Sequence, residues 1–345
     1  MKKKMLRHIA GGSAAALLAL LGAGAGRAQE ADFFKGKNVD LYIGYSAGGG
    51  YDVYGRIVAR HIGKHLPGKP NVVPKNMEGA GSLRLTNWIA KVAPKDGTAF
   101  GIISRSTAFD PLFGYPGAQF TGTDLTWIGS ANNEVSVCVT TAESGIGTID
   151  EAKAKEVAMG ASGPNDDTGQ FPKVINGLLG TKFKVVTGYP GGNDVVLAME
   201  RGEVQGRCGW SWSSLLTTHK DMLDNKRINL LLQTALTKHP DLPNVPVITE
   251  LAQTEEQKQM IRLFFARQVM GRPFVAPPNL PPERLAVLRK AFVDTMKDPE
   301  FLAEAAKAKL EINPVSGEEV QELVREIYKT PPEVAKKAAA LVGVN

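Results

Sequence analysis

Residues 39–56 limit the possible folds of this chain more than any other stretch. Apolar side chains at Val39, Leu41 and Ile43 alternate with polar ones, which predicts a β-strand. A glycine-rich run at residues 46–50 follows, and apolar residues then recur at helical spacing. A helix that starts directly after such a turn has backbone N–H groups without intrahelical partners, and its dipole favours negative charge at that end. The stretch therefore predicts an α/β fold with a site for a small anion.

The same order of strand, polar or glycine-rich turn and helix continues along the chain. Further strands are expected at residues 71–76, 98–104, 156–161, 183–189 and 204–208. Repeated strand–helix units of this kind predict parallel sheets with helices on both faces.

The chain is long enough for two domains, and two segments are expected to connect them. A broken strand over residues 127–139 leaves the first domain, and a strand over residues 228–233 returns to it. We therefore expect a domain 2 at residues 134–228. A discontinuous domain 1 is then formed by residues 29–133 and 229–345.

The first 28 residues have the pattern of a secretory signal peptide. A basic start is followed by an uncharged Ala/Leu/Gly run and by small residues before Gln29, so cleavage after Ala25 or Ala28 and export to the periplasm are expected. Five of the 41 lysines and arginines lie here with no acidic residue, which leaves 36 basic and 35 acidic residues in the rest of the chain. The basic pI of the full sequence therefore does not indicate nucleic-acid binding.

The two cysteines, Cys138 and Cys208, leave two alternatives open. In an oxidising compartment they can form a disulfide, which stabilises the fold by roughly 4 kcal/mol in the loop-entropy model. They can equally be two small buried thiols.

One motif suggests a serine hydrolase. Residues 44–48 match the G-x-S-x-G nucleophile elbow in a strand-to-helix context, with Ser46 as the nucleophile. No His-Gly-Gly-Gly stretch precedes the motif, and the candidate bases His219 and His239 are expected at surface or turn positions. An exported hydrolase is therefore the alternative, and the absence of enzyme activity is the expectation.

Other motifs for cofactors or metals are incomplete. The glycine run fails the P-loop pattern, since Arg56 and Ile57 stand where Lys and Ser/Thr belong, and it lacks the third glycine of the dinucleotide fingerprint. His61 and His65 are four residues apart on an expected helix but have no evident third metal ligand. We expect neither a cofactor nor a metal.

Three side chains near the expected anion site have alternative roles. Arg105 follows the third strand at the same sheet edge as Ser46, where it either pairs with a ligand carboxylate or is a solvated surface residue. Trp210, after a strand of the second domain, either walls the cleft or packs in the core. Asp52 would repel an anion, so it is interpreted as a cap that fixes the glycine-rich loop.

Four motifs in sequence order resemble those of a known family. They are Tyr-Ser-Ala-Gly-Gly-Gly-Tyr-Asp at residues 45–52, Asn-Met-Glu-Gly-Ala-Gly-Ser at 76–82, Ala-Pro-Lys-Asp-Gly-Thr at 93–98 and Leu-Pro-Asn-Val-Pro at 242–246. Together they resemble the solute receptors of tripartite tricarboxylate transporters, the Bug family. The resemblance spans essentially the whole chain after the expected signal peptide.

The resemblance implies a periplasmic solute-binding protein with a type II-like fold. Two α/β domains, joined by two crossing strands, would close around a small carboxylate-containing solute in the cleft between them. The protein would act as a monomer, deliver the solute to membrane permease subunits and bind no nucleic acid. A receptor of the same fold that feeds a sensor kinase is a further alternative.

The resemblance also implies a set of ligand-binding residues. Backbone N–H groups of the first loop and of the loop at residues 162–168 would hold one carboxylate of the solute. The expected set is Tyr45, Ser46, Ala47, Gly48, Gly49, Asp52, Ser82, Arg105, Ser106, Ser162, Asp166, Asp167, Thr168, Tyr189, Gly191 and Trp210. The sequence departs from the family at residues 44–46, where Pro-Phe-Pro is usual, and at residues 166–168, where many members carry a histidine. Selectivity for the distal end of the solute would then depend on side chains such as Arg105, Tyr189 or Trp210.

Overall fold

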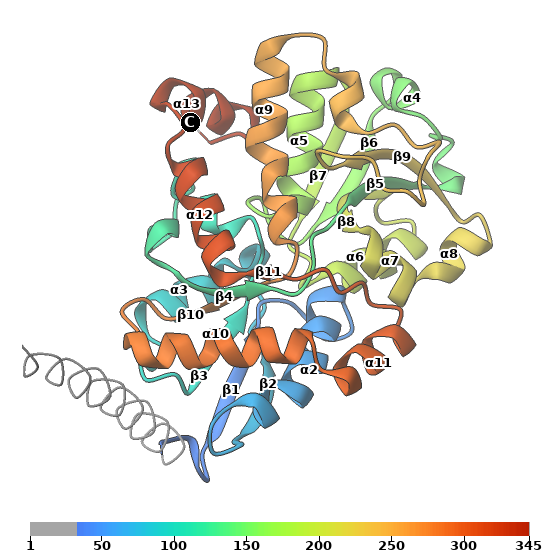
Figure 1. Ribbon diagram of the computed structural model, residues 1–345. Helices are drawn as coiled ribbons and strands as arrows, with labels where there is room; N and C mark the ends of the chain where they lie inside the picture. Colours follow the sequence, from blue (N-terminus) through green and yellow to red (C-terminus); the bar gives the residue numbers. More distant parts are fainter. Residues whose placement is uncertain (1–32, 345) are drawn as a thin grey trace, which may run out of the picture.

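The computed structural model describes residues 33–344, which form two lobes that are each built on a separate β-sheet (Figure 1). The expected signal peptide lies outside the described residues. We use "first lobe" for the part around the six-stranded sheet and "second lobe" for the part around the five-stranded sheet.

The sheet of the first lobe has the strand order β11-β4-β10-β3-β1-β2. Its strands are β1 (Asn38–Ile43), β2 (Asn71–Asn76), β3 (Ala99–Ile102), β4 (Thr126–Ser130), β10 (Pro273–Ala276) and β11 (Val315–Ser316). The strands β2, β1 and β3 are parallel, whereas β10 and β11 pair antiparallel with their neighbours. The parallel part is the strand–helix repeat that the sequence predicts.

Helices cover both faces of this sheet. The alternating residues Val39, Leu41 and Ile43 are fully buried in one cluster with side chains of α2 (Gly50–Ile62), α10 (Pro282–Met296) and α11 (Pro299–Lys307). On the opposite face lie α3 (Leu83–Lys91) and α12 (Gly317–Tyr328), where Tyr42 packs against Trp88 at 4.4 Å between ring centroids. The period-two pattern of β1 thus correctly predicts that alternate side chains of the strand face opposite sides of the sheet.

The sheet of the second lobe has the strand order β7-β6-β8-β5-β9. Its strands are β5 (Ser136–Thr141), β6 (Val157–Ala161), β7 (Phe183–Thr187), β8 (Gly206–Ser211) and β9 (Ile228–Thr234). The helices with it are α4 (Ile149–Ala154), α5 (Asp167–Leu179), α6 (Gly192–Glu200), α7 (Trp212–Thr218) and α8 (Lys220–Asp224). Strands β7, β6 and β8 are parallel, and β5 is antiparallel to both β8 and β9.

The chain passes to the second lobe between β4 and β5, close to the predicted boundary, but it returns to the first lobe later than predicted, and within residues 33–344 no strand belongs to both sheets. β9 pairs with β5 along its whole length, so it belongs to the second sheet and not to the first. The chain then continues through α9 (Glu255–Phe265), whose Gln257 bonds to the C-terminal end of α5, and rejoins the first sheet only at β10. The expected start of the second part of domain 1 at residue 229 therefore falls inside the second sheet.

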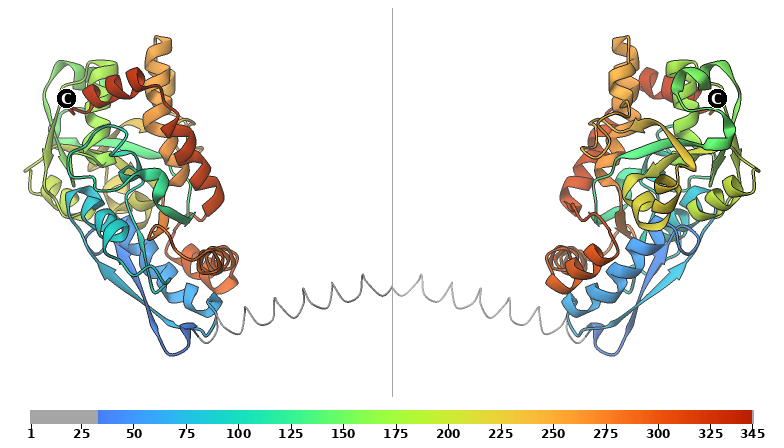
Figure 2. Two further views of the ribbon diagram at one scale, coloured as in Figure 1. Left: turned by 90° about the vertical axis from the view of Figure 1, so that its left-hand side faces the viewer. Right: turned by 90° about the vertical axis from the view of Figure 1, so that its right-hand side faces the viewer.

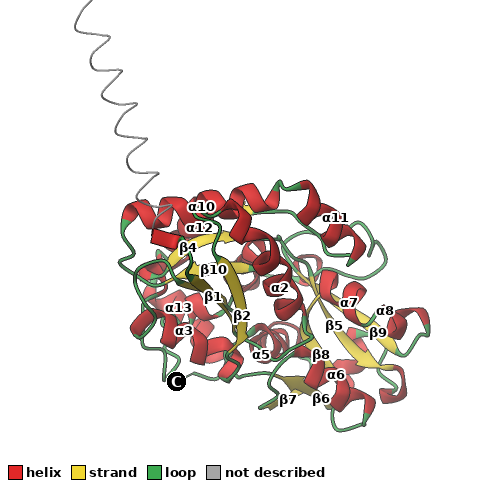
Figure 3. Cartoon of the chain, turned by 90° about the horizontal axis from the view of Figure 1, so that it is seen from below, coloured by secondary structure: helices red, strands yellow, loops and turns green. Residues whose placement is uncertain are grey.

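The C-terminal segment also contacts both lobes. α12 packs on β4 of the first lobe, and α13 (Pro332–Leu341) then packs on α5 of the second lobe, as the side views show (Figure 2). Viewed from below, α2 lies next to α7 at the boundary between the two sheets (Figure 3).

Cys138 and Cys208 are joined in a disulfide within the second sheet. The two residues lie on the neighbouring strands β5 and β8, and both are fully buried. Of the two alternatives that the sequence leaves open, the structure therefore contains the bonded form.

Candidate ligand-binding site

A small cavity of about 60 Å³ lies between the two lobes. Its walls combine helix N-termini, hydroxyl groups and several charged side chains from both sheets. The first lobe contributes Tyr45, Gly49, Gly50, Tyr51, Ser104, Arg105 and Arg272. The second lobe contributes Ser162, Asp166, Asp167, Thr168, Gly192, Asn193, Arg207, Gly209, Trp210, Ser211, Ser214 and Thr218.

The N-termini of three helices meet at this cavity. α2 begins at Gly50, α5 at Asp167 and α6 at Gly192, and all three residues line the cavity. The N-cap residues of α2 and α6 are Gly49 and Gly191, which make no side-chain capping bond, so the first-turn N–H groups of these helices are left for another acceptor. A Cβ atom added at Gly49 would lie 4.0 Å from the backbone nitrogen of Gly192, so the two helix ends face each other closely.

The N-terminus of α5 is already occupied by a carboxylate of the chain itself. Asp166 accepts bonds from Thr168 Oγ1 at 2.6 Å, from the backbone nitrogen of Gly169 at 3.2 Å and from the hydroxyl of Ser162. Tyr45 of the first lobe adds a fourth donor at 3.3 Å. Burial raises the pKa of Asp166, although these donors oppose the shift. The donors around the loop at residues 162–168 thus bond to a carboxylate of the loop itself, that of Asp166.

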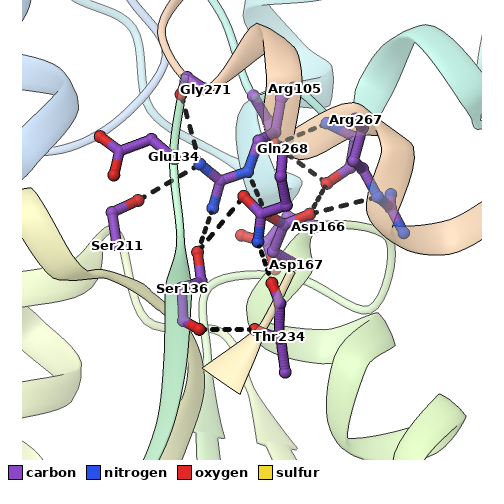
Figure 4. Close-up of polar contacts among 12 residues, drawn as sticks. Arg105, Glu134, Ser136, Asp166, Asp167, Ser211, Thr234, Arg267, Gln268 and Gly271 are labelled. Carbon is purple, nitrogen blue, oxygen red and sulfur yellow. Dashed lines mark hydrogen bonds and ion pairs between the residues drawn. The ribbon is translucent and has the colours of Figure 1, made fainter. Parts of the chain in front are cut away.

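Arg105, in the cavity wall, connects the two lobes through its polar contacts (Figure 4). Its guanidinium forms an ion pair with Asp167 of α5 and donates to Ser136 at 2.8 Å, Ser211 at 3.2 Å and the carbonyl of Gly271 at 3.3 Å. The side chain is only 1% exposed. Asp167 also accepts from Ser106 at 2.6 Å. Of the two roles left open for Arg105, the solvated surface residue is therefore wrong.

A second buried arginine, Arg272, is likewise neutralised. It lies 2.9 Å from the carboxylate of Glu134 and donates to Ser214 at 2.6 Å. Its guanidinium also stacks over Tyr51, 4.9 Å from the ring centroid.

Arg207 differs from the other two arginines. It is 5% exposed and donates to the carbonyl of Gly192 at 2.8 Å, while its carbon Cζ lies 4.6 Å from the ring centroid of Trp210. Its Nε atom has no hydrogen-bond partner, and no carboxylate of residues 33–344 lies within ion-pair distance of it. Burial lowers the pKa of Arg207 to about 10, because little nearby negative charge compensates for the lost hydration.

The glycine-rich loop closes the mouth of the cavity. Ser46 Oγ donates to Asp194 of α6 at 2.6 Å, and its backbone nitrogen bonds to the carbonyl of Pro190 at 3.4 Å. A Cβ atom on Gly191 would lie 2.3 Å from Ser46 Oγ, so a glycine is needed there for the loops to meet. Within the described part of the chain, no histidine bonds to Ser46, and its hydroxyl serves as a contact between the lobes.

The structure brings half of the expected ligand-binding residues to the cavity wall. These are Tyr45, Gly49, Arg105, Ser162, Asp166, Asp167, Thr168 and Trp210. Ala47 and Gly48 are exposed beside the mouth, and Tyr189 does not line the cavity.

Three further expected residues support the walls from behind. Asp52 accepts from the backbone nitrogen of Gly48 at 2.8 Å and from Arg56, which matches the structural cap predicted for it. Ser82 accepts from the backbone nitrogen of Ser104 at 3.1 Å, and Ser106 bonds to Asp167.

Sequence reasoning missed Arg207 and Arg272, which reach the cavity from β8 and from just before β10. The one available signal for Arg207 was its position within an otherwise small and apolar strand, where a solvated charge is unusual.

His61 of α2 and His65 of the 3₁₀ turn that follows it (Gly63–His65) bond to carboxylates of α11 and its N-cap. His61 bonds to Glu304 at 2.6 Å and His65 to Asp298 at 2.7 Å. His61, Asp298 and Glu300 could surround a cation, but Lys64 already lies 2.8 and 2.7 Å from the two carboxylates.

Within residues 33–344, no helix is long and apolar enough to cross a membrane.

Comparison with known proteins identifies relatives of this chain. The family model for the tripartite tricarboxylate transporter family receptor matches residues 55–339. A UPF0065 protein from the tcbD-tcbE intergenic region of Pseudomonas sp. (strain P51) is 28% identical over 232 residues, which cover 66% of each protein. The chain thus spans about two thirds of that relative's length.

Solved structures share the fold at low sequence identity. The periplasmic binding protein BugD superimposes with a TM-score of 0.71 at 18% identity, over 88% of this chain and 98% of that one. Rpa4515 of R. palustris with adipate gives 0.69 at 18% identity, with the same coverage. MatC (Rpa3494) from Rhodopseudomonas palustris with bound malate gives 0.68 at 15% identity, over 86% and 98%.

These structural matches confirm the expected fold of a periplasmic binding protein with two α/β domains. The family model covers most of the described residues, including the cavity-lining residues from Ser104 onward. The chain belongs to the family of tripartite tricarboxylate transporter receptors and is a solute-binding receptor.

Proposed function

We propose that this receptor binds a small carboxylate-containing solute in the cavity between its lobes. The observation that carries the proposal is the pair of uncapped helix N-termini, α2 and α6, which face each other from opposite lobes. Their first-turn N–H groups need an acceptor, and the helix dipoles favour an anionic one. Since each lobe supplies one helix end, a bound carboxylate would stabilise the closed arrangement of the lobes.

The energies are sufficient for useful affinity. Each charge-assisted hydrogen bond contributes roughly 1.5–3 kcal/mol. A helix terminus adds up to about 2 kcal/mol in a partly buried site. Three or four such bonds therefore reach the −8 kcal/mol of micromolar binding, before the cost of closure is deducted.

The solved relatives support a carboxylate as the ligand class. One was solved with adipate and another with malate. By the role of its family, the protein would be exported to the periplasm by its N-terminal segment and would deliver its solute to membrane permease subunits.

A thermal shift experiment tests the proposal. The protein without its first 28 residues is heated with increasing concentrations of di- and tricarboxylates, aromatic acids and amino acids. Each acid that raises the melting temperature is then compared with its neutral amide. A bound carboxylate is expected to raise the melting temperature by mass action, with about 2.7 kcal/mol of stabilisation at a concentration of 100 Kd. The amide should have no effect. If no carboxylate in the panel raises the melting temperature, the proposal is wrong.

A further inference from the structure

The unpaired guanidinium of Arg207 points to a specific chemical class of solute. Arg207 lines the cavity, is 95% buried and, within residues 33–344, has one hydrogen bond, to the carbonyl of Gly192. The Arg207 side chain packs between the first turn of α6 and the ring of Trp210. A Cβ atom on Gly192 would lie only 3.1 Å from Nη1 of Arg207, so the glycine leaves room for the guanidinium. The backbone of α6 is thus shaped to admit the guanidinium at its N-terminus.

The other charges of the cavity wall have partners. Arg105 is paired with Asp167, and Arg272 with Glu134. The carboxylate of Asp166 is satisfied by four neutral donors. A buried charge without a partner is costly, and a cavity that keeps one gains by binding the opposite charge. Among the lining arginines, Arg207 has no carboxylate of residues 33–344 within ion-pair distance, and Asp166 acts on it only from farther away.

We propose that Arg207 is a specificity-determining residue that binds a second anionic group of the solute, so that the receptor selects short dicarboxylates over monocarboxylates. The inference rests on the proposed function, in which the ends of α2 and α6 hold the first carboxylate through backbone N–H groups. Those groups carry no formal charge, so a monocarboxylate bound there leaves the guanidinium without an ion-pair partner of its own. A second carboxylate provides that partner where the guanidinium lines the cavity.

The size of the cavity favours a short spacer between the two anionic groups. Its volume of about 60 Å³ is below the ~150 Å³ of a cavity that holds a benzene ring, so even a short dicarboxylate requires the lobes to separate slightly, and a long spacer requires a larger separation. Arg207 and the N-terminus of α6 are also adjacent, because the guanidinium bonds to the first residue of that helix. Both observations fit a solute with three or four carbons better than a longer chain.

Isothermal titration calorimetry with length-matched pairs tests this inference. Succinate is compared with butyrate, and malonate with propionate, at one pH and one ionic strength. The wild-type protein is expected to bind each dicarboxylate ~ten- to hundredfold more tightly than its monocarboxylate, the range of one charge-assisted pair. Arg207→Gln should reduce this ratio to about threefold or less, while Arg207→Lys should retain part of it.

Arg201→Gln is the matched control, since it removes the same charge from an exposed site of the same lobe. Its ratio should equal that of the wild-type protein. Equal affinities for succinate and butyrate in the wild-type protein would overturn the inference and leave the proposed function intact. A ratio that survives Arg207→Gln would overturn it as well. If none of the four acids binds, both the inference and the proposed function are contradicted. If Arg207→Gln does not fold, the affinity ratios of the wild-type protein and of Arg207→Lys decide the question.

Discussion

At the level of single residues, the interface between the lobes is notable for buried charge. Asp110 of the first lobe is fully buried and accepts from Asn165 of the second lobe at 2.6 Å through one oxygen, while its other oxygen has no partner among residues 33–344. Burial raises the pKa of Asp110 well above its usual value, although Asn165 and the positive charge of Arg267 oppose the shift. The ionised form of this carboxyl group therefore opposes folding and closure.

The pH dependence of stability should reveal this group. Because its pKa is higher in the folded protein than in the unfolded chain, the folded state holds a proton that the unfolded state loses near pH 4. The contribution of Asp110 is thus most favourable below that pH and falls as the pH rises through its folded pKa. Asp110→Asn should increase the free energy of unfolding at pH 7 by about 1 kcal/mol or more, with little gain below pH 4. Urea unfolding at a series of pH values measures the difference.

Asp124→Asn provides the comparison, because Asp124 is exposed in the same lobe. It should change stability little at any pH. A loss of stability in Asp110→Asn at pH 7 would show that the ionised carboxylate is needed, through the charge of Arg267, and would contradict the prediction.

The residues of the site were predictable only where local sequence determines them. The glycine-rich loop and the cap Asp52 follow from a strand, a turn and a helix that are contiguous in sequence. The pairing of Arg105 with Asp167 joins residues 62 positions apart, and no local pattern specifies it. Arg207 was missed for the same reason, since its lack of a partner is a property of the assembled cavity.

At the level of elements, the strand–helix repeat was predicted well because apolar periodicity is a local signal. The expected strand at residues 71–76 coincides with β2, and the expected strand at 228–233 differs from β9 by one residue. The partner of β9 was not predicted, since its pairing with β5 depends on residues about 90 positions earlier in the chain. Sequence patterns thus locate strands, but the order of strands within a sheet depends on long-range packing.

The disulfide between β5 and β8 should contribute strongly to the stability of the second lobe. It closes a loop with a sequence separation of 70 residues, for which the loop-entropy model gives about 4 kcal/mol. Because both residues are fully buried among apolar side chains, the double substitution Cys138→Ala with Cys208→Ala removes the bond without burying a new polar group. Urea unfolding should show this loss. The wild-type protein in excess reductant should lose a similar amount, and a double variant as stable as the oxidised protein would contradict the assignment.

At the level of the whole molecule, the lobes make direct contacts across the cavity. The bond of Ser46 to Asp194, the bond of Tyr45 to Asp166 and the ion pair of Arg105 with Asp167 all cross it. In an open arrangement these groups would be hydrated. Closure therefore exchanges water contacts for contacts between the lobes, and the solute adds the remaining free energy.

Gly50 offers a way to hinder closure mainly through the opposite lobe, since within its own lobe an added Cβ atom would only approach the guanidinium end of Arg272, at 3.3 Å. It is the first residue of α2 and has a backbone conformation that alanine can adopt. A Cβ atom there would lie 1.9 Å from Ser214 Oγ and 2.8 Å from Ser214 Cβ in the second lobe. Rotation of the serine hydroxyl cannot relieve the contact with its Cβ atom, so Gly50→Ala should cost about 1–3 kcal/mol in the closed state alone. Solute affinity should fall roughly 5- to 150-fold, while urea unfolding of the unliganded protein changes much less, because separated lobes avoid the clash.

Two further variants test whether the clash between the lobes is the cause. Gly147→Ala is the control for adding a methyl group, because its Cβ atom would meet only ordinary contacts at 3.6 Å and beyond. Ser214→Gly, introduced into the Gly50→Ala protein, removes the clashing atoms and should restore most of the affinity, since Arg272 keeps its contacts with Glu134 and Ser213. If the double variant binds as weakly as Gly50→Ala, the loss arises within α2 itself, and closure of the lobes onto this helix end is not what holds the solute.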